Sequence, residues 1–225
     1  MFNFKKAAVA QQILRKKVQV KPLETSINYV AGCDLTFLNP FKTPTVGIAA
    51  FTLFKYPELD LIEKVWISGE VEIPYVPGFL AFREIPLLVR AFNKLSTKPD
   101  IVIVDGHGIA HPRRMGVASH FGVVTGTPTI GCAKKPLYGN FSPPENRKGA
   151  FSFIFDEEGK RIGAVLRTKV NVKPVYVSPG HLIDVEGGLH LVYNCVKSYR
   201  LPEPTRISHN FLKGIRKQLM KNNKK

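Results

Sequence analysis

Two acidic side chains stand where apolar segments end in charge. Asp34 follows the apolar run 29–33, and Asp105 follows the wholly apolar run 101–104. We expect each carboxylate at the carboxyl end of a strand, where open sheets bind ligands. Either aspartate alone fits a turn or a helix cap better. Together with Glu84, on a predicted helix, they favour a site for a hard divalent cation that takes oxygen ligands, foremost Mg²⁺.

A second chemically suggestive segment presents an aromatic ring between two prolines. In Pro74-Tyr75-Val76-Pro77 the prolines restrict the backbone on both sides of Tyr75, which lowers the entropy cost of holding the ring in solvent. Such a ring can wedge into a base stack, where stacking contributes about 1–3 kcal/mol per base. Composition alone favours the alternative, a tyrosine folded back onto the core.

The elements that must position these side chains alternate between strands and helices, without internal repeats. We predict strands at 28–37, 45–54, 61–73, 101–104 and 128–133, and a further hairpin at 150–168. We predict helices at 7–18, 78–95 and 114–124, and two more helices after the hairpin. The first three strands indicate an antiparallel meander, and the apolar run 101–104 indicates a central strand buried on both faces. The prediction is an α/β fold, a mixed central sheet flanked by helices, in a single domain over residues 1–225.

Positive charge gathers at the two ends of the chain. Of the 33 basic residues, 13 lie in residues 1–23 and 205–225, which hold no acid, and the middle holds 20 basic against 17 acidic residues. A basic N-terminal helix (about 1–21) and a basic C-terminal helix and tail (about 205–225) would attract a polyanion such as nucleic acid. For Arg15–Lys17 and for Lys213, Arg216 and Lys217, contact with phosphates and a merely solvated surface remain equally open. For Lys221–Lys225 a solubilising tail is favoured.

The cysteine content and the absence of long apolar runs limit the cellular compartment and the class of protein. The three cysteines are far apart and form no CxxC pair, so neither a zinc knuckle nor a disulfide scaffold is suggested, and a reducing compartment fits. We find no signal-peptide pattern and no apolar run long enough to span a membrane. We therefore expect a soluble, cytoplasmic protein, and we expect a monomer.

A series of irregular motifs carries a family resemblance over nearly the whole chain. Their order and spacing resemble endonuclease V at residues 30–35 (VAGCDL), 74–84 (PYVPGFLAFRE), 100–108 (DIVIVDGHG), 110–113 (AHPR), 128–134 (PTIGCAK), 178–181 (SPGH) and 200–206 (RLPEPTR), and the match continues to His209. Each motif alone is a weak signal, but unrelated proteins would not share all of them in one order.

The resemblance implies a ribonuclease H-like core and a repair nuclease that recognises inosine. Such an enzyme hydrolyses the second phosphodiester bond 3′ of the lesion and leaves a 3′-hydroxyl and a 5′-phosphate. The metal-binding carboxylates would be Asp34, Glu84 and Asp105, with Mg²⁺, or Mn²⁺ in its place. His209 would stand beside a second metal position, although the pattern alone indicates a surface histidine. Lys134 would hold a phosphate near the metals.

The same resemblance implies the substrate-binding residues. Tyr75 would be the tip of a wedge framed by Pro74 and Pro77. A flipped base would enter a pocket near Gly78, Leu80, Gly106 and Gly116, where glycines let backbone groups approach its edge. Further substrate-binding residues are Arg83 and His111; for His111 and Arg113, capping of the following helix is almost as plausible as a place in the cleft. Bacterial relatives often carry Gln at the position of His107, so its effect on activity is open.

Two other classes of protein fit parts of the pattern. The chain could be a non-catalytic nucleic-acid-binding module whose acids are structural, or a metal-dependent phosphatase on small substrates; the basic ends argue against the phosphatase. The sequence leaves open whether inosine in DNA, in RNA or in single strands is the main substrate, because a contact to the 2′-hydroxyl is not readable from it.

Overall fold

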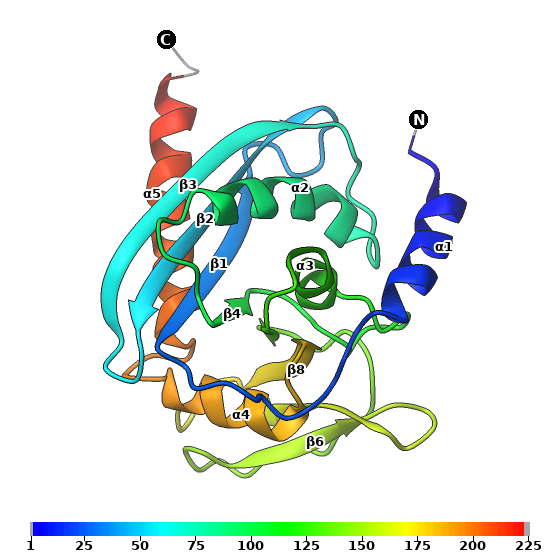
Figure 1. Cartoon of the computed structure of the whole chain (residues 1–225), viewed down its shortest axis with the longest axis vertical. Coiled ribbons are helices and arrows are strands. Elements are labelled where there is room, and N and C mark those ends of the chain that lie inside the picture. Colours follow the sequence, from blue (N-terminus) through cyan, green and yellow to red (C-terminus); the bar gives the residue numbers. More distant parts are fainter. Residues whose placement is uncertain (1, 223–225) are drawn as a thin grey trace.

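A single mixed sheet runs through the whole molecule, and a computed structural model describes it over residues 2–222 (Figure 1). Its eight strands lie in the order β3-β2-β1-β4-β5-β8-β7-β6, in which only the β1–β4 and β4–β5 pairs are parallel. The strands are β1 (Tyr29–Phe37), β2 (Thr45–Lys55), β3 (Asp60–Val71), β4 (Ile101–Val104), β5 (Thr129–Ala133), β6 (Phe151–Phe155), β7 (Arg161–Leu166) and β8 (Val175–His181). The helices are α1 (Phe4–Arg15), α2 (Leu80–Asn93), α3 (Val117–Thr125), α4 (Val185–Asn194) and α5 (Glu203–Asn222).

Helices cover both faces of the sheet because the central strands are apolar on both sides. Ala31 and Cys33 of β1 pack with α2 and α3 on one face, whereas Val30 packs with α4 on the other. All four residues of β4 are buried, as expected for a central strand. The predicted meander of the first three strands and the predicted α/β architecture are confirmed.

Close backbone packing places α5 against β1. A Cβ atom at Gly32 would lie only 2.1 Å from the carbonyl carbon of Pro204, so a side chain there would push the helix away. The Ser208 hydroxyl donates to the carbonyl oxygens of Gly32 and Ala50, each at 3.2 Å. These contacts fix the rotation of α5, and with it the position of the next residue, His209.

The structure differs from the sequence prediction at several places, and α1 spans Phe4–Arg15 instead of 7–18. β8 was not predicted, because Pro179 and Gly180 interrupt the usual strand pattern. α3 begins at Val117 instead of Arg114, because Arg114 has a positive φ of 56°, which a helix cannot accommodate. Asp34 lies inside β1, which continues to Phe37, and so it does not end its strand. Among residues 2–222, no helix has the length and apolar character that a membrane crossing requires.

Candidate active site

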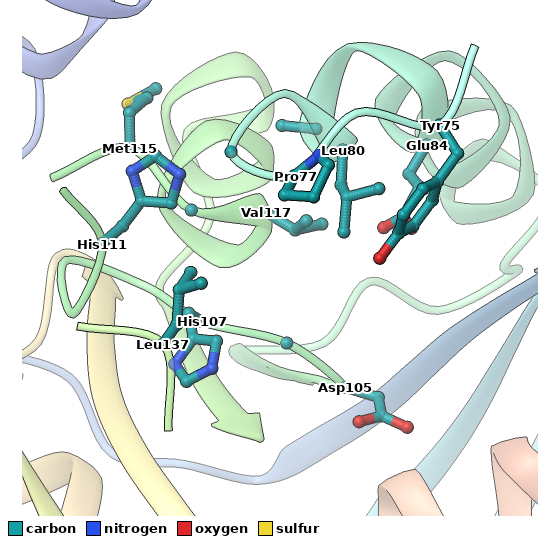
Figure 2. Close-up of a pocket in the computed structure, with 14 residues that line it drawn as sticks. Tyr75, Pro77, Leu80, Glu84, Asp105, His107, His111, Met115, Val117 and Leu137 are labelled. Atoms are coloured by element: carbon teal, nitrogen blue, oxygen red, sulfur yellow. The ribbon is translucent and has the colours of Figure 1, made fainter. Parts of the chain in front are cut away.

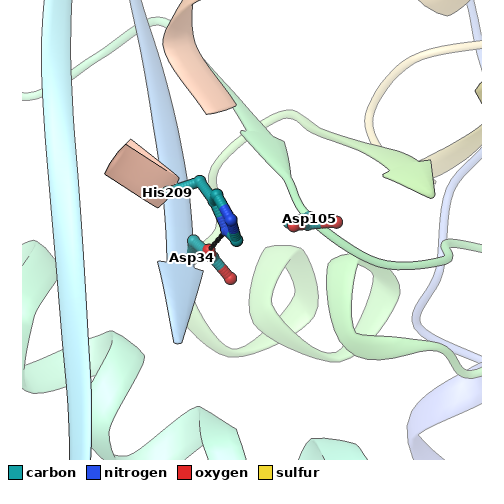
Figure 3. A group of neighbouring side chains, drawn as sticks. All are labelled: Asp34, Asp105 and His209. Atoms are coloured by element: carbon teal, nitrogen blue, oxygen red, sulfur yellow. Dashed lines mark hydrogen bonds and ion pairs between the residues drawn. The ribbon is translucent and has the colours of Figure 1, made fainter. Parts of the chain in front are cut away.

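Asp34 and Asp105 lie side by side where β4 ends next to β1. Cys33 and Val104 are the last residue pair of the parallel ladder, and each aspartate follows directly after one of them. The Asp105 amide donates to the carbonyl oxygen of Cys33 at 3.2 Å, which holds the two positions in register. His209 reaches over from α5, with its Nδ1 2.7 Å from Oδ2 of Asp34. Ligand atoms of Asp34, Asp105 and His209 all lie within 4.8 Å of one another (Figure 3).

Burial and neighbouring negative charges disfavour the ionised form of two acids at this site. Burial, and then the neighbouring charge of Asp34, raises the pKa of Asp105. Burial and the charges of Asp34 and Asp105 raise the pKa of Glu84 to about 8. The hydrogen bond to Asp34 raises the pKa of His209. Crowded carboxylates with one imidazole form an oxygen-rich donor set, which suits a divalent cation.

Glu84 approaches this cluster from the opposite face of the sheet. It belongs to α2, whereas His209 comes from α5, and these two helices pack on opposite faces of the sheet. Glu84 is outside the group whose ligand atoms lie within 4.8 Å, yet it and Asp105 line the same pocket.

A cationic groove begins at the acidic cluster. Lys134 follows β5 directly, and its ammonium group pairs with the Asp105 carboxylate. The groove, of about 310 Å³, is lined by Asp34, Leu35, Thr36, Asp105, Lys134, His209, Leu212, Lys213 and Arg216. Lys213 and Arg216 also line the next hollow along α5, together with Lys217, Met220 and Lys221. A polyanion that reached the acids would therefore meet a row of cations on α5.

A second hollow, of about 180 Å³, adjoins the acids on the other side (Figure 2). It is lined by Tyr75, Pro77, Gly78, Leu80, Ala81, Glu84, Asp105, Gly106, His107, His111, Met115, Gly116, Val117 and Leu137. Seven of the residues predicted to bind substrate are in this set; Pro74 and Arg83 are not. We call it the base pocket, after the flipped base that the family resemblance predicts for these residues. Glu84 and Asp105 connect it to the acidic cluster.

Comparison with known proteins shows which family the chain is similar to. The family model described as Endonuclease V matches residues 12–210. The chain belongs to the endonuclease V family. The endonuclease V of Thermosipho melanesiensis is 43% identical over 213 residues, which cover 95% of this chain and 91% of that protein. As a member of this family, the chain is an endonuclease.

Solved structures agree with the fold. The crystal structure of Bacillus subtilis endonuclease V has a TM-score of 0.92 and 34% identity, and the match covers 99% of this chain and 95% of that one. A Ciona intestinalis endonuclease V, solved in complex with a 24mer DNA containing an inosine followed by a ribo-adenosine, has a TM-score of 0.82 and 24% identity, covering 96% and 98%. The predicted ribonuclease H-like α/β fold is thereby confirmed.

A buried hydrogen-bond network closes one end of the base pocket. Gly78 has a φ of +81°, a conformation that favours glycine, and its carbonyl turns toward α1. That oxygen accepts from Gln11 Nε2 at 2.9 Å and from Arg113 Nη2 at 2.7 Å, and Arg113 Nε donates to Gln11 Oε1 at 2.5 Å. The Arg113 guanidinium also stacks on the Phe79 ring, 4.4 Å from its centroid.

Gln11 was not among the residues predicted to matter. It is fully buried, one helical turn after buried Ala7, so the spacing of these two residues marks the inward face of α1. The base pocket therefore depends on a helix that the sequence marked only as a basic arm. The sequence did not predict three further lining residues, Met115, Val117 and Leu137, because apolar residues in such segments usually belong to the hydrophobic core.

Two histidines give the base pocket polar groups without charge. Burial lowers the pKa of His107 and of His111 to about 4. His107 Nε2 lies 3.0 Å from the Lys135 carbonyl oxygen, which can only accept, so this nitrogen carries the proton. His111 Nδ1 accepts from the Arg113 amide at 3.1 Å, which leaves its proton on Nε2. Both rings are therefore neutral near pH 7, which suits an uncharged heterocycle.

Arg83 lies outside both hollows, and neither His111 nor Arg113 caps helix α3. The Arg83 side chain is 1% exposed and its guanidinium lies 3.9 Å from the centroid of the Phe37 ring, away from both hollows. The cap of α3 is Gly116, which makes no side-chain cap hydrogen bond. His111 and Arg113 therefore do not cap that helix, and of the two only His111 lines the base pocket.

Proposed function

We propose that this chain is a Mg²⁺-dependent endonuclease of nucleic-acid repair that recognises inosine. It hydrolyses the second phosphodiester bond on the 3′ side of the lesion and leaves a 3′-hydroxyl and a 5′-phosphate. The observation that carries the proposal is the continuity of the two hollows. Glu84 and Asp105 line the base pocket, and Asp105 also lines the cationic groove. One strand can thus place a base in the first hollow and its 3′ phosphates in the second.

The acidic cluster supplies the metal-binding groups of this proposal. Asp34, Glu84 and Asp105 would hold Mg²⁺, or Mn²⁺ in its place, and His209 would stand at a second position. A bound divalent cation would lower the pKa of the attacking water and neutralise charge on the departing oxygen. His209 is oriented for its role by Asp34, 2.7 Å away.

Lys134 would bind the phosphate that is cut. Its ammonium group pairs with Asp105, so it already stands at the junction of the two hollows. A fixed cation at this point offsets the negative charge that grows on the phosphoryl oxygens during hydrolysis. Lys213 and Arg216 would hold phosphates farther along the groove.

Base recognition would use the shape and neutrality of the base pocket. Tyr75 lines the pocket and is 47% exposed, so its ring is available to separate stacked bases, with Pro74 and Pro77 stiffening the loop. Inosine has a carbonyl group where adenine has an amino group, and it lacks the amino group of guanine. A close-fitting pocket with backbone donors near Gly78, Leu80, Gly106 and Gly116 can reject both other bases.

One chain supplies every group that the proposal needs, so we propose that it acts as a monomer. Inosine in DNA is the substrate we favour, with RNA and single strands as further candidates. A DNA that contains inosine is bound by the related Ciona intestinalis protein. All three cysteines are buried and free, which is consistent with the reducing cytoplasm.

The test is a cleavage assay with matched strands. Inosine-containing and adenosine-containing DNA and RNA are incubated with Mg²⁺ or with chelator, and the cut position is mapped. We expect a cut only with inosine and only with the cation. The Asp105→Asn variant should lose at least about 100-fold in rate while it keeps its affinity for the strand. Cutting that resists chelator, or full activity of Asp105→Asn, would overturn the proposal; turnover of a mononucleotide alone would indicate a phosphatase.

A further inference from the structure

Phe41 is the most exposed large hydrophobic residue in the described part of the chain. Its side chain is 85% exposed and it lies in the loop between β1 and β2, at the end of the strand that carries Asp34. A phenylalanine this exposed gains almost none of the free energy that burial of its ring would give. No role predicted from the sequence accounts for it.

Hydrogen bonds and prolines restrict the backbone of the loop that carries this ring. The Lys42 amide donates to the Asn39 carbonyl oxygen at 3.1 Å, and the Asn39 amide donates to Thr45 Oγ1 at 3.2 Å. Pro40 and Pro44 restrict the backbone on either side of Phe41. The arrangement resembles that of Tyr75 between Pro74 and Pro77, and the restricted backbone lowers the entropy cost of ordering the ring against a ligand.

The two exposed rings touch each other. The ring centroids of Phe41 and Tyr75 are 5.9 Å apart and the ring planes meet at 79°, an edge-to-face contact. Tyr75 lines the base pocket, whereas Phe41 does not. Phe41 therefore lies beyond Tyr75 as seen from the pocket, where it can contact only what flanks an inserted nucleotide. Lys42, the next residue in the chain, is exposed as well and adds a positive charge to the same loop.

We propose that Phe41 is a second stacking residue of the nucleic-acid surface, which binds a nucleobase flanking the nucleotide in the base pocket. Its place at the rim rests on the proposed function, but stacking on a base needs no cleavage. A nucleobase is the occupant that the site favours, because an exposed ring in contact with Tyr75, in a loop that also exposes Lys42, matches the alternation of bases and phosphates.

Binding measured in chelator tests this inference apart from catalysis. Fluorescence anisotropy is recorded for a labelled DNA duplex with one inosine, using the wild type and the Phe41→Ala, Phe41→Leu and Phe41→Trp variants. Loss of one stacked base should weaken binding about 5- to 100-fold in Phe41→Ala. Phe41→Leu should stay weak, because it is apolar without a π-face. Phe41→Trp should bind like the wild type, with its fluorescence quenched by the base.

The matched control is Phe151→Ala, which removes an exposed ring on β6 at the far edge of the sheet and should bind as the wild type does. Unchanged affinity of Phe41→Ala, or full affinity of Phe41→Leu, would overturn the inference. The inference would also be overturned if Phe41→Ala abolished a dimer of the wild type and left the affinity for DNA unchanged. If the wild type cuts inosine strands and Phe41→Ala binds normally, only this inference fails. If Phe41→Ala loses affinity and the wild type cuts nothing, only the proposed function fails.

Discussion

The amide of Asp105 donates to the carbonyl oxygen of Cys33, and this one bond sets Asp105 beside Asp34. The two aspartates are 71 positions apart in sequence, yet each stands one residue past the last pair of the β1–β4 ladder. Parallel pairing thus brings two carboxylates together at a fixed register, and burial keeps their mutual repulsion strong. A cation relieves that repulsion, so the fold itself favours metal binding here.

Lys134 should affect the chemical step more than substrate binding. In Lys134→Ala the fixed cation next to Asp105 is lost, and we expect kcat to fall about 100-fold with a small change in KM. Divalent-cation affinity, measured by calorimetry, should rise, because Asp105 loses its competing partner. The exposed neighbour provides the control, Lys135→Ala, which should keep wild-type kcat. Equal losses in the two variants would refute this role.

Gln11 should support the base pocket from α1. Gln11→Ala removes the donor to the Gly78 carbonyl and leaves Arg113 Nε without its partner, so we expect unfolding free energy to fall by about 1–3 kcal/mol. The kcat/KM for inosine-containing strands should also fall, because the loop of Tyr75 loses its anchor. Gln12→Ala changes the same residue type on the exposed side of α1 and should match the wild type in both thermal unfolding and kinetics. If Gln12→Ala loses as much stability and activity, the loss comes from a general change in helix α1 and not from the hydrogen bonds of Gln11.

Lys213 should contribute to binding through phosphate contact. Lys213→Ala should weaken affinity at low salt and reduce the slope of log K against log salt by about 1, with kcat unchanged at saturation. The comparison variant is Lys148→Ala, an exposed cation outside the groove, which should leave the slope as it is. An unaltered slope in Lys213→Ala would mean that the α5 cations only face solvent.

Buried His120 should make the protein acid-sensitive. Its side chain is 6% exposed, and burial lowers its pKa from 6.5 to about 4. Between these values the unfolded chain binds a proton that the folded chain does not, so stability falls as pH falls from 6.5 to about 4, by up to about 3 kcal/mol. His120→Leu should lose less stability than the wild type between pH 7 and 4 in urea unfolding. Identical pH profiles would contradict this explanation.

Local sequence patterns were sufficient to predict most of the strands and helices near the site. The apolar run Ile101–Val104 predicted β4, and successive apolar segments divided by turn residues predicted the β1–β2 pair, because such patterns act within a few positions. The strand β8 escaped prediction because Pro179 and Gly180 are poor strand residues, yet β5 and β7 pair with it on both sides. Tertiary pairing outweighed local propensity there.

The sequence by itself determined which chemical groups are available: carboxylates after apolar runs, a ring between prolines, and cations at the two ends. Only the tertiary structure decided which of them meet. His209 reaches Asp34 across 175 positions because α5 packs on the bare backbone of Gly32, and Arg83 is buried although its neighbour Glu84 faces the acids. Adjacency and burial depend on contacts between distant segments, so neither the raised pKa of Glu84 nor the pairing of Phe41 with Tyr75 could be read from spacing along the chain.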